Sequence, residues 1–488
     1  MSVLNGLQPE RVFYYFEKIA SIPHGSGNIS AISAYIASFA EEKGLDSVRD
    51  DPGNVIIRKP GTAGYEDKPV VILQGHMDMV CEKDEDCDLD MESEGLILQT
   101  DGSSVTAKGT TLGGDDGVAV AIMLAILESD DIAHPPIEAV FTVDEEIGML
   151  GAAALDMSSL MGRILINIDS EDEGVITAGC AGGALIKGTF AIDWEDAPAP
   201  QSSDDRPTGR VSVFRISITG LIGGHSGIEI DKNRANAHVL LGRMLEDLAK
   251  DDGFSLSRID GGSKDNVIPT VATAIVMADE DRLRDKVIKW ERVFADEFAS
   301  TDPDIHIGVE ECDIDKVMSR LSQETVISAL RALPNGVQRM SPELAGTVRT
   351  SLNIGVINLS DIEFEIGLLV RSSVTSEKEE LIGRVCRIIK ILGGDVDVSG
   401  DYPCWSYRRE SPLRDHMVAV YKNMYGHEPK VESVHAGVEC GFFDRGIADL
   451  DAVSIGPDLK DIHTPAESMG IESVRRIWEY LLEVLKNM

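Results

Sequence analysis

The amino-acid sequence predicts an α/β protein with a largely parallel sheet and an inserted unit of α+β type. Three observations lead to this prediction. The 488 residues exceed the length at which one hydrophobic core stops growing, so at least two domains are expected. Short apolar runs of strand length alternate with helical patterns in the first third of the chain, as in parallel sheets. Between about residues 186 and 400 the expected order becomes strand–helix–strand–strand–helix–strand, the ferredoxin-like order.

Two helical patterns open the chain, and runs of strand length follow them. Pro9 precedes a pattern in which Val12 and Phe16 fall on one face, and a second helix over residues 29–43 is expected to stop at Gly44. The next strands are expected at residues 54–58, 70–73, 137–143 and 163–168, with a helix at 118–127 among them. The chain is expected to end with a helix over residues 472–486.

The middle of the chain is predicted to form two similar α+β units behind an extended linker at residues 189–210, which holds three prolines and the acidic run 193–196. The first unit is expected to have strands at 211–219, 254–259, 270–277 and 305–310 and helices at 235–249 and 282–299. The second is expected to have helices at 323–333 and 376–392 and strands at 344–358, 362–372 and 395–399. The second unit would therefore lack one strand of the ferredoxin-like set.

The composition of the chain argues against two classes of partner and indicates a cellular compartment. The formal net charge of −39 would repel nucleic acid and anionic membranes, so neither is expected as a partner. Seven scattered cysteines without a C-x-x-C pair do not form a disulfide framework and favour a reducing, cytoplasmic setting. Residues 1–7 lack a basic segment followed by an apolar one, and no apolar run approaches the ~20 residues that span a bilayer. We therefore expect a soluble protein that is not exported.

Polar side chains follow three of the expected strands of the first third. His76 and Asp78 come directly after the strand at 70–73, the acidic run 144–146 follows the strand at 137–143, and Asp169 follows the strand at 163–168. Ligands in open α/β sheets bind beyond the carboxyl ends of the strands, so these side chains are expected to converge.

Two further stretches also carry acidic or histidine side chains that could bind a metal ion. Residues 112–118 contain an acidic pair, Asp115 and Asp116, between glycines and just before a helix; capping of that helix is the alternative explanation for the pair. Residues 461–467 add His463 in a loop before the final helix. Histidines and carboxylates together form a mixed N/O ligand set suited to Zn²⁺, Mn²⁺ or Co²⁺. One carboxylate shared by two ions would make a two-metal hydrolytic centre.

Five motifs in this order resemble the M20 family of co-catalytic metallopeptidases: G-H-M-D (75–78), G-G-D-D-G (113–117), D-E-E-I-G (144–148), I-D-S-E-D-E-G (168–174) and D-I-H-T-P-A-E (461–467). The similarity covers essentially the whole chain and is greatest to the cytosolic aminoacyl-histidine (Xaa-His) dipeptidases, which are carnosinase-like. It implies hydrolysis of dipeptides with a free N-terminus, preferentially Xaa-His, by a water that bridges two metal ions. The resemblance implies two divalent ions per chain, most naturally Zn²⁺, with Co²⁺ or Mn²⁺ as alternatives.

The resemblance also implies a role for each residue of the predicted metal centre. Glu145 would be the general base, and Asp78 would orient His76. Asp116 would replace Asp115 as a ligand if the loop were turned by one residue, although the family pattern favours Asp115. The implied metal ligands are His76, Asp115, Glu146, Asp169 and His463.

Within the inserted part, the resemblance implies contacts to the substrate. His225, in the glycine-rich stretch 223–228, would stabilise the oxyanion of the tetrahedral intermediate, whereas capping of a turn is the alternative role. Asn266 would help to hold the substrate. Arg371 is the first choice for binding the substrate carboxylate, and Arg349 is the alternative.

The loop at residues 435–441 is the last informative stretch, in which Gly437 and Glu439 match a family segment that lines the pocket. The implied organisation is a catalytic domain formed by residues 1–185 and 401–488 around a lid at 186–400. A doubled lid would make dimerisation optional, although a homodimer stays possible. Two alternatives remain open: the same metal centre acting on tripeptides or N-acyl-amino acids, and a non-catalytic protein that binds metal or peptide.

Overall fold

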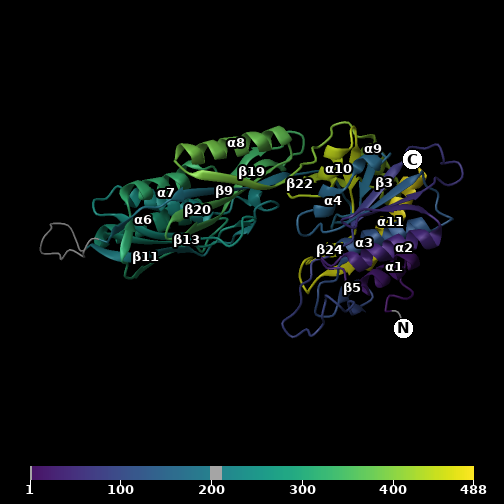
Figure 1. The fold of residues 1–488 in the computed structure, drawn as a ribbon, viewed down its shortest axis with the longest axis horizontal. Coiled ribbons are helices and arrows are strands. Elements are labelled where there is room, and N and C mark those ends of the chain that lie inside the picture. Colours follow the sequence, from purple (N-terminus) through teal and green to yellow (C-terminus); the bar gives the residue numbers. More distant parts are fainter. Residues whose placement is uncertain (1–2, 198–210) are drawn as a thin grey trace. The chain divides into compact units, whose positions relative to one another are not determined.

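The chain folds into two units, each with its own hydrophobic core (Figure 1). The structure is a computed structural model that describes residues 3–197 and 211–488, so the second half of the expected linker lies outside the described residues. Unit 1 comprises the chain up to Cys180 together with Trp405–Ser433 and Val438–Met488. Unit 2 comprises Ala181–Cys404 and Val434–Gly437.

Unit 1 contains an eight-stranded sheet in the order β1-β2-β6-β3-β7-β23-β8-β22. Its central strands β6, β3, β7 and β23 are parallel, and β1, β2 and β8 pair with their neighbours in the antiparallel sense. All residues of β3 and β6 are buried, as expected for strands covered on both faces. The predicted α/β class is confirmed. The strands are β1 (Asp46–Arg49), β2 (Val55–Lys59), β3 (Val71–His76), β6 (Ile137–Thr142), β7 (Ile164–Asn167), β8 (Val175–Cys180), β22 (Lys430–Val434) and β23 (Asp451–Ser454).

Helices cover this sheet, and unit 1 also contains a small, separate second sheet. Helix α3 (Gly114–Glu128) is apolar on all sides and packs on β3 and on α1, because Val118–Leu127 is buried throughout. As predicted, α2 ends at Gly44, which adopts a left-handed φ of 67°. The other helices are α1 (Glu10–Ala20), α2 (Ser30–Lys43), α4 (Leu150–Ala154), α9 (Pro412–Tyr425), α10 (Cys440–Gly446) and α11 (Ile471–Lys486). The small sheet joins β4 (Leu98–Thr100), β5 (Ser104–Ala107), β24 (Leu459–Lys460) and β25 (Ser468–Gly470).

The first half of unit 2 has the predicted ferredoxin-like arrangement. Its strands lie in the order β16-β11-β15-β13, and its helices α5 and α6 pack on them. Every strand pair in this half is antiparallel. The elements are β11 (Val211–Thr219), α5 (Ala237–Leu248), β13 (Ser255–Gly261), β15 (Ala272–Asp279), α6 (Glu280–Glu297) and β16 (His306–Glu311).

The second half of unit 2 is complete, so the expectation that it lacks a strand is wrong. Its missing strand is β9 (Gly182–Ala191), which precedes the expected linker and pairs with both β20 and β21. The first half is thus inserted between β9 and the rest of the second, and one residue pair, Gly261 with Ile357, joins the two halves of the sheet. The remaining elements are α7 (Arg320–Ala332), β18 (Gly336–Met340), β19 (Val348–Leu359), β20 (Glu363–Ser372), α8 (Thr375–Ile391) and β21 (Asp395–Tyr402).

Part of the expected linker is also ordered as a strand. β10 (Trp194–Asp196) pairs with β17 (Lys316–Met318), so the acidic run 193–196 is not an extended loop. The indole of Trp194 explains this, because it donates a hydrogen bond to the Asp361 carbonyl and lies beneath the Lys316 ammonium. Two short strands, β12 (Gly224–His225) and β14 (Val267–Ile268), pair with each other in the same unit.

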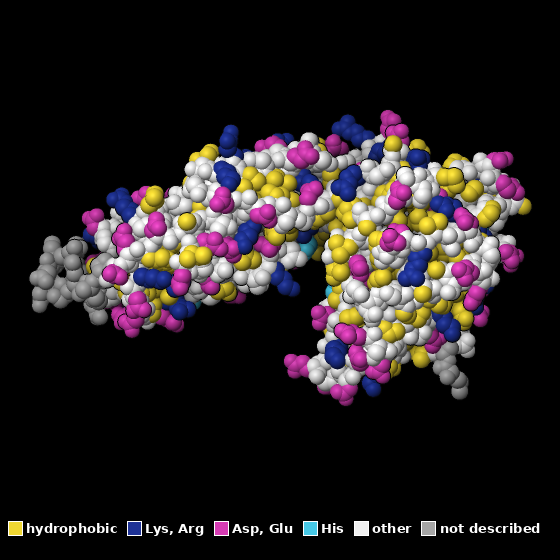
Figure 2. All heavy atoms as spheres, in the orientation of Figure 1, with side chains coloured by type: hydrophobic (Ala, Val, Ile, Leu, Met, Phe, Trp, Pro, Cys, Tyr) yellow, Lys and Arg dark blue, Asp and Glu magenta, His cyan; other side chains and the backbone are white. Residues whose placement is uncertain are grey.

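The surface carries the acidic excess in a dispersed form. On the face shown in Figure 2, Asp and Glu side chains are interspersed with Lys, Arg and apolar side chains over both units. Among residues 3–197 and 211–488, no helix combines the length and the apolar character that crossing a bilayer requires.

Candidate metal centre

Acidic and imidazole side chains from five segments of unit 1 meet at the carboxyl ends of β3, β6 and β7. His76 is the last residue of β3, the pair Glu145 and Glu146 follows β6, and Asp169 follows β7. The first turn of α3 and the loop between β24 and β25 complete the group with Asp115 and His463. The sheet positions the first three segments, and its parallel centre explains why they converge.

Asp115 lies between the two histidines. Its Oδ1 is 3.1 Å from Nε2 of His76, and its Oδ2 is 3.4 Å from Nε2 of His463. Nε2 of His76 also lies 3.7 Å from Oδ1 of Asp169, and Nε2 of His463 lies 3.0 Å from Oε2 of Glu146. The five expected ligands therefore form two groups that share Asp115. Glu145 lies beside them, within 4.8 Å of His76 and Glu146 ligand atoms.

Asp116 has a different environment from Asp115. Its side chain also lies within 4.8 Å of ligand atoms of His76 and Asp169. However, its Oδ2 already accepts a hydrogen bond from the backbone N–H of His76, at 3.1 Å. Burial, and then the charge of Asp169, raises the pKa of Asp116 well above its usual value. These features favour Asp115 over Asp116 as the shared carboxylate.

Asp78 links the strand end to the loop that carries the two glutamates. Its Oδ1 accepts from the Glu145 N–H at 3.0 Å, and its Oδ2 accepts from the Glu146 N–H at 3.3 Å and from Oγ of Ser26 at 2.8 Å. Nδ1 of His76 lies 3.0 Å from the backbone carbonyl of Asp78 and 3.5 Å from its Oδ1, which leaves Nε2 directed at Asp115. Burial opposes ionisation, but the hydrogen bonds from His76, Glu145 and Ser26 hold the pKa of Asp78 below its usual value. Asp78 can therefore orient both the imidazole and the loop.

The donor set carries more buried negative charge than its histidines can balance. Burial, and then the charges of Asp115 and Glu146, raises the pKa of Asp169 to about 7 in spite of His76. Burial also raises the pKa of Glu145 well above its usual value, and the carboxylates of Asp169 and Glu439 add to this. Hydrogen bonds to Asp115 and Glu146 raise the pKa of His463 to about 10. Divalent cations would supply the charge that these groups lack, so the residues fit a metal centre.

Unit 2 brings together the other predicted residues except Glu439. His225 in β12 pairs with Val267 in β14, next to the exposed Asn266, whose carbonyl accepts from the Ser226 N–H at 2.8 Å. Nδ1 of His225 accepts from the N–H groups of Gly227 and Ile228, at 3.3 and 3.2 Å. Its proton therefore resides on Nε2. Burial, and then Arg371, lowers the pKa of His225, so its neutral, donor form is favoured.

The two candidate arginines differ in how fully they are paired. Arg349 forms an ion pair with Glu377, to which its Nε donates at 3.1 Å. Arg371 is buried and donates from Nη1 to the Tyr402 hydroxyl at 2.8 Å, but its Nε has no hydrogen-bond partner among the described residues. This difference favours Arg371 as the arginine available to a ligand.

His435 lies in the same region of unit 2, two residues before Gly437. Its Nε2 lies 2.8 Å from Oγ of Ser351, which is directly opposite Arg371 in the β19–β20 pair. Burial, and then the charges of Arg371 and His225, lowers the pKa of His435 to about 3. No role was predicted for His435, although it begins the stretch 435–441, and Ser351 belongs to no motif that the sequence offered.

Comparisons with known proteins agree with this arrangement. Residues 72–487 match the model of peptidase family M20/M25/M40. The chain belongs to this family. It is 37% identical to the cytosol non-specific dipeptidase of Escherichia coli over 100% of this chain and 99% of that protein. A solved aminoacylhistidine dipeptidase from Vibrio alginolyticus matches with a TM-score of 0.92 and 38% identity, covering 99% of this chain and 98% of that one. The predicted family is thereby confirmed.

A solved structure with much lower sequence identity also resembles this chain in its fold. An aminopeptidase from Bacillus cereus matches with a TM-score of 0.57 and 15% identity over 98% of both chains. That likeness concerns the fold alone.

Glu467 belongs to the same M20 motif as His463, but no role was predicted for it. Its Oε2 accepts from the N–H groups of Leu112 and Gly113 at 2.7 and 3.1 Å, and its Oε1 accepts from Gly114 and Asp115 at 2.8 and 3.4 Å. One buried carboxylate thus holds the turn that presents Asp115. The only sequence signal was an acidic residue four positions after His463.

Glu439, which the family resemblance placed in the lining of the pocket, is buried in unit 1 close to the metal centre. It is fully buried in unit 1, and its Oε2 accepts from Nε2 of Gln74 at 2.5 Å and from Oγ1 of Thr142 at 2.6 Å. Oε1 of Gln74 in turn accepts from Nδ2 of Asn167 at 2.8 Å. This network connects β3, β6 and β7 beneath their carboxyl ends, and it does not favour a direct contact of Glu439 with substrate.

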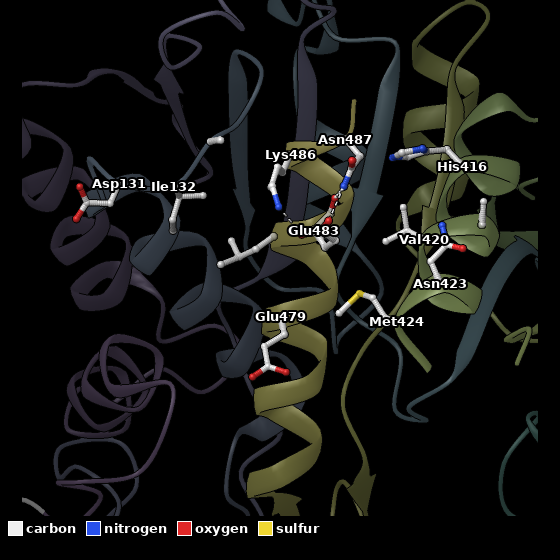
Figure 3. A pocket seen from close by; sticks show the side chains of 13 residues that line it. Asp131, Ile132, His416, Val420, Asn423, Met424, Glu479, Glu483, Lys486 and Asn487 are labelled. Carbon is white, nitrogen blue, oxygen red and sulfur yellow. Dashed lines mark hydrogen bonds and ion pairs between the residues drawn. The ribbon is translucent and has the colours of Figure 1, made fainter. Parts of the chain in front are cut away.

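A groove of about 1070 Å³ lies away from the metal centre in unit 1, between α9 and α11 (Figure 3). None of the residues that line it belongs to the metal centre. Several of its polar side chains are already paired: Nε2 of His416 lies 3.1 Å from the Val484 carbonyl, and Glu483 binds Lys486 and Asn487. The groove therefore offers no chemistry comparable to that of the metal centre.

Proposed function

We propose that the chain is a metal-dependent dipeptidase that hydrolyses dipeptides with a free N-terminus. One observation carries the proposal: the expected ligands form two groups that share Asp115, while Glu145 lies beside them. The two relatives, whose names describe dipeptidases, support the choice of substrate. One is called non-specific and the other aminoacylhistidine-specific, so the preference for Xaa-His is the finer part of the proposal.

Five residues would hold two divalent ions. His76 and Asp169 would bind one ion and Glu146 and His463 the other, with Asp115 shared. Zn²⁺ is the first choice, with Co²⁺ or Mn²⁺ as alternatives, since imidazole and carboxylate ligands suit all three. When bound, such ions lower the pKa of water and polarise the scissile carbonyl.

The predicted site residues that are not metal ligands would carry out the remaining steps of the reaction. Glu145 would take the proton from the attacking water and pass it to the leaving amine, because it lies within 4.8 Å of ligand atoms of His76 and Glu146 without being an expected ligand. Asp78 keeps Nε2 of His76 directed at the ligand group. His225 would donate a hydrogen bond from its Nε2–H to the oxyanion, and Arg371 would bind the substrate carboxylate. Asn266 and Gly437 would complete the substrate contacts from unit 2.

The two units suggest how these roles are distributed. Unit 1 would be the catalytic domain and unit 2 the lid, with boundaries close to the expected ones at residues 185 and 401. Because unit 2 contains two complete ferredoxin-like halves, one chain would suffice for catalysis, and a homodimer would be optional. The word cytosol in the name of the Escherichia coli relative supports a cytoplasmic location.

The test is a panel of substrates offered to the metal-loaded and the chelator-treated protein. We expect hydrolysis of Xaa-His and other dipeptides, slower or no hydrolysis of tripeptides and acetyl-amino acids, and loss of all activity without metal. Activity that survives complete metal removal would refute the mechanism. Preference for tripeptides or acetyl-amino acids would replace the substrate class, and no hydrolysis at all would leave a binding protein. Strict dependence of activity on protein concentration would contradict the self-sufficient lid.

A further inference from the structure

Arg371 carries a buried positive charge that its neighbours leave partly unpaired. The residue is 6% exposed, and its Nη1 donates to the Tyr402 hydroxyl at 2.8 Å. Its Nε has no hydrogen-bond partner, and no carboxylate of residues 3–197 or 211–488 forms an ion pair with the guanidinium. A buried cation without a counter-ion is costly, so this part of unit 2 is suited to an anion that comes from outside the protein.

Ser351 lies directly beside Arg371 on the neighbouring strand. The two residues are opposite each other in the antiparallel β19–β20 pair. Directly opposite side chains lie on the same face of a sheet, with their Cβ atoms about 4.5–5.5 Å apart. The next residues of the two strands, Leu352 and Val370, are buried in the core of unit 2, so the first pair occupies the opposite face. The Ser351 hydroxyl is therefore within reach of a group that binds the guanidinium.

His435 holds the hydroxyl of Ser351. Its Nε2 lies 2.8 Å from Oγ of Ser351, and the two residues are 6% and 1% exposed. Nδ1 of His435 is buried and has no hydrogen-bond partner among the described residues. A buried N–H without an acceptor is rarer than an acceptor without a donor, which favours the tautomer with its proton on Nε2. In that tautomer the imidazole donates to Oγ, and the Ser351 hydroxyl is free to donate its own proton to a ligand.

His435 is also neutral, as its place near a guanidinium requires. Burial, and then the charges of Arg371 and His225, lower its pKa, although the Val348 carbonyl favours the charged ring. A neutral imidazole adds no second positive charge, yet it keeps one hydrogen-bond donor and one acceptor. His435 and Ser351 together therefore provide a directed donor beside the guanidinium.

We propose that Ser351 donates a hydrogen bond to the substrate carboxylate at Arg371, and that His435 is the positioning residue that directs the Ser351 hydroxyl. This inference rests on the proposed function, in which Arg371 binds that carboxylate. All three residues belong to unit 2, so the site is contained within one unit. One carboxylate oxygen would accept from the free Nε of Arg371 and the other from the Ser351 hydroxyl.

The test compares kcat/KM of the metal-loaded enzyme for Leu-His and for Leu-His amide, which lacks the carboxylate. Ser351→Ala should lower kcat/KM for the acid about tenfold, chiefly through KM, because a hydrogen bond to a charged group is lost. The value for the amide should change by less than about twofold. Ser257→Ala is the matched control and should leave the ratio of acid to amide unchanged. Ser257 is 2% exposed in the same unit, and its hydroxyl donates to the Lys316 carbonyl at 2.8 Å.

Variants of His435 test whether this residue acts through Ser351. His435→Leu should lower kcat/KM for the acid by about the same factor as Ser351→Ala, and combining the two changes should add little further loss. His435→Gln, whose amide can donate in place of Nε2, should recover most of the activity on the acid. These two variants carry the test if Ser351→Ala does not fold. Additive losses would contradict the positioning role, and equal losses on acid and amide would overturn the carboxylate contact.

Binding measurements separate this inference from the proposed function. If the unchanged enzyme hydrolyses dipeptides but does not prefer the acid to the amide, the inference falls while the dipeptidase function stands. If it hydrolyses no dipeptide, the proposed function fails, and calorimetry with Leu-His and its amide still decides the inference. Tighter binding of the acid that Ser351→Ala weakens would support the carboxylate contact. Equal binding of acid and amide, or an acid preference that survives in Ser351→Ala, would overturn it.

Discussion

The two units each bury a cluster of charged side chains, but the clusters have opposite character. The acidic cluster of unit 1 consists of the five expected ligands and Glu145, and it raises the pKa of Asp169 to about 7 and that of His463 to about 10. The basic cluster of unit 2 consists of His225, Arg371 and His435, and burial, followed by the charges of Arg371 and His225, lowers the pKa of His435 to about 3. Two histidines of one chain thus shift in opposite directions.

The difference shows what each cluster is built to receive. Raised pKa values mean that added positive charge is stabilised, which is the property of a cation site. Burial lowers the pKa of both histidines of unit 2, and the Arg371 guanidinium adds to this, so Arg371 is the positive charge that an anion such as a substrate carboxylate would meet there. We therefore expect the metal ions to bind to unit 1 and the negative groups of the substrate to bind to unit 2.

Within the acidic cluster, the neighbouring residues Glu145 and Glu146 are expected to have the most different roles. Glu145→Ala should lower kcat by about 10³-fold or more, because a positioned general base contributes up to about 10⁴-fold. Two ions should remain bound, since Glu145 is not an expected ligand. Measurement of kcat together with metal content after dialysis checks this result.

Glu146→Ala is the matched control for that experiment. It should lose one ion, because Glu146 lies 3.0 Å from Nε2 of His463 in one ligand group. If Glu145→Ala loses an ion and Glu146→Ala keeps both, the two roles must be exchanged.

In the basic cluster, His225 is expected to act on the transition state. His225→Ala should lower kcat by about 10²- to 10³-fold, the usual cost of removing an oxyanion donor, and should change KM by less than about threefold. Metal content should not change. His306→Ala, at an exposed histidine of the same unit, should leave both constants unaltered. A loss of bound metal in the His225 variant would make this histidine a ligand instead.

Arg371 is expected to act on binding of the substrate carboxylate. Arg371→Ala should lower kcat/KM about 10- to 100-fold for free dipeptides, since a hydrogen bond to a charged group is worth about 1.5–3 kcal/mol. Dipeptide amides, which lack the carboxylate, should be affected far less. The comparison of kcat/KM for acids and amides checks this.

Arg349→Ala provides the control for the arginine assignment. Because Arg349 is paired with Glu377, its removal should lower Tm and leave the preference for acids over amides intact. If Arg349→Ala abolishes that preference and Arg371→Ala does not, the carboxylate site must be reassigned to Arg349.

The sequence predicted those features that local patterns encode. Apolar runs located β3, β6 and β7, and the motifs that follow them located the acidic cluster. Strand β9 was missed because Gly182 and Gly183 weaken a strand pattern. Tertiary contacts explain why both positions are glycine. A side chain at Gly182 would meet the backbone of Cys404, and one at Gly183 would meet Tyr402.

Residues that act through distant partners could not be predicted in the same way. Glu467 lies 352 positions from Asp115, and no period or spacing connects a carboxylate to backbone N–H groups so far away. The acceptor role of Nδ1 in His225 likewise depends on the local backbone path at Gly227 and Ile228. Such contacts appear only when the chain is folded.

The smallest expected effect concerns Glu467, which supports the acidic cluster without being an expected ligand. Glu467→Gln replaces one carboxylate oxygen by an amide NH₂ that faces backbone donors, so the turn carrying Asp115 should be held less firmly. We expect metal affinity to fall about 10- to 100-fold, the range found when supports of metal ligands are removed. At saturating metal, kcat should recover to within a few fold of the unchanged enzyme, which a loss of folding would not permit. Glu472→Gln, at a solvent-facing carboxylate of α11, should leave metal affinity unaltered. A Glu467→Gln variant with normal metal affinity would show that the turn keeps its shape without this carboxylate.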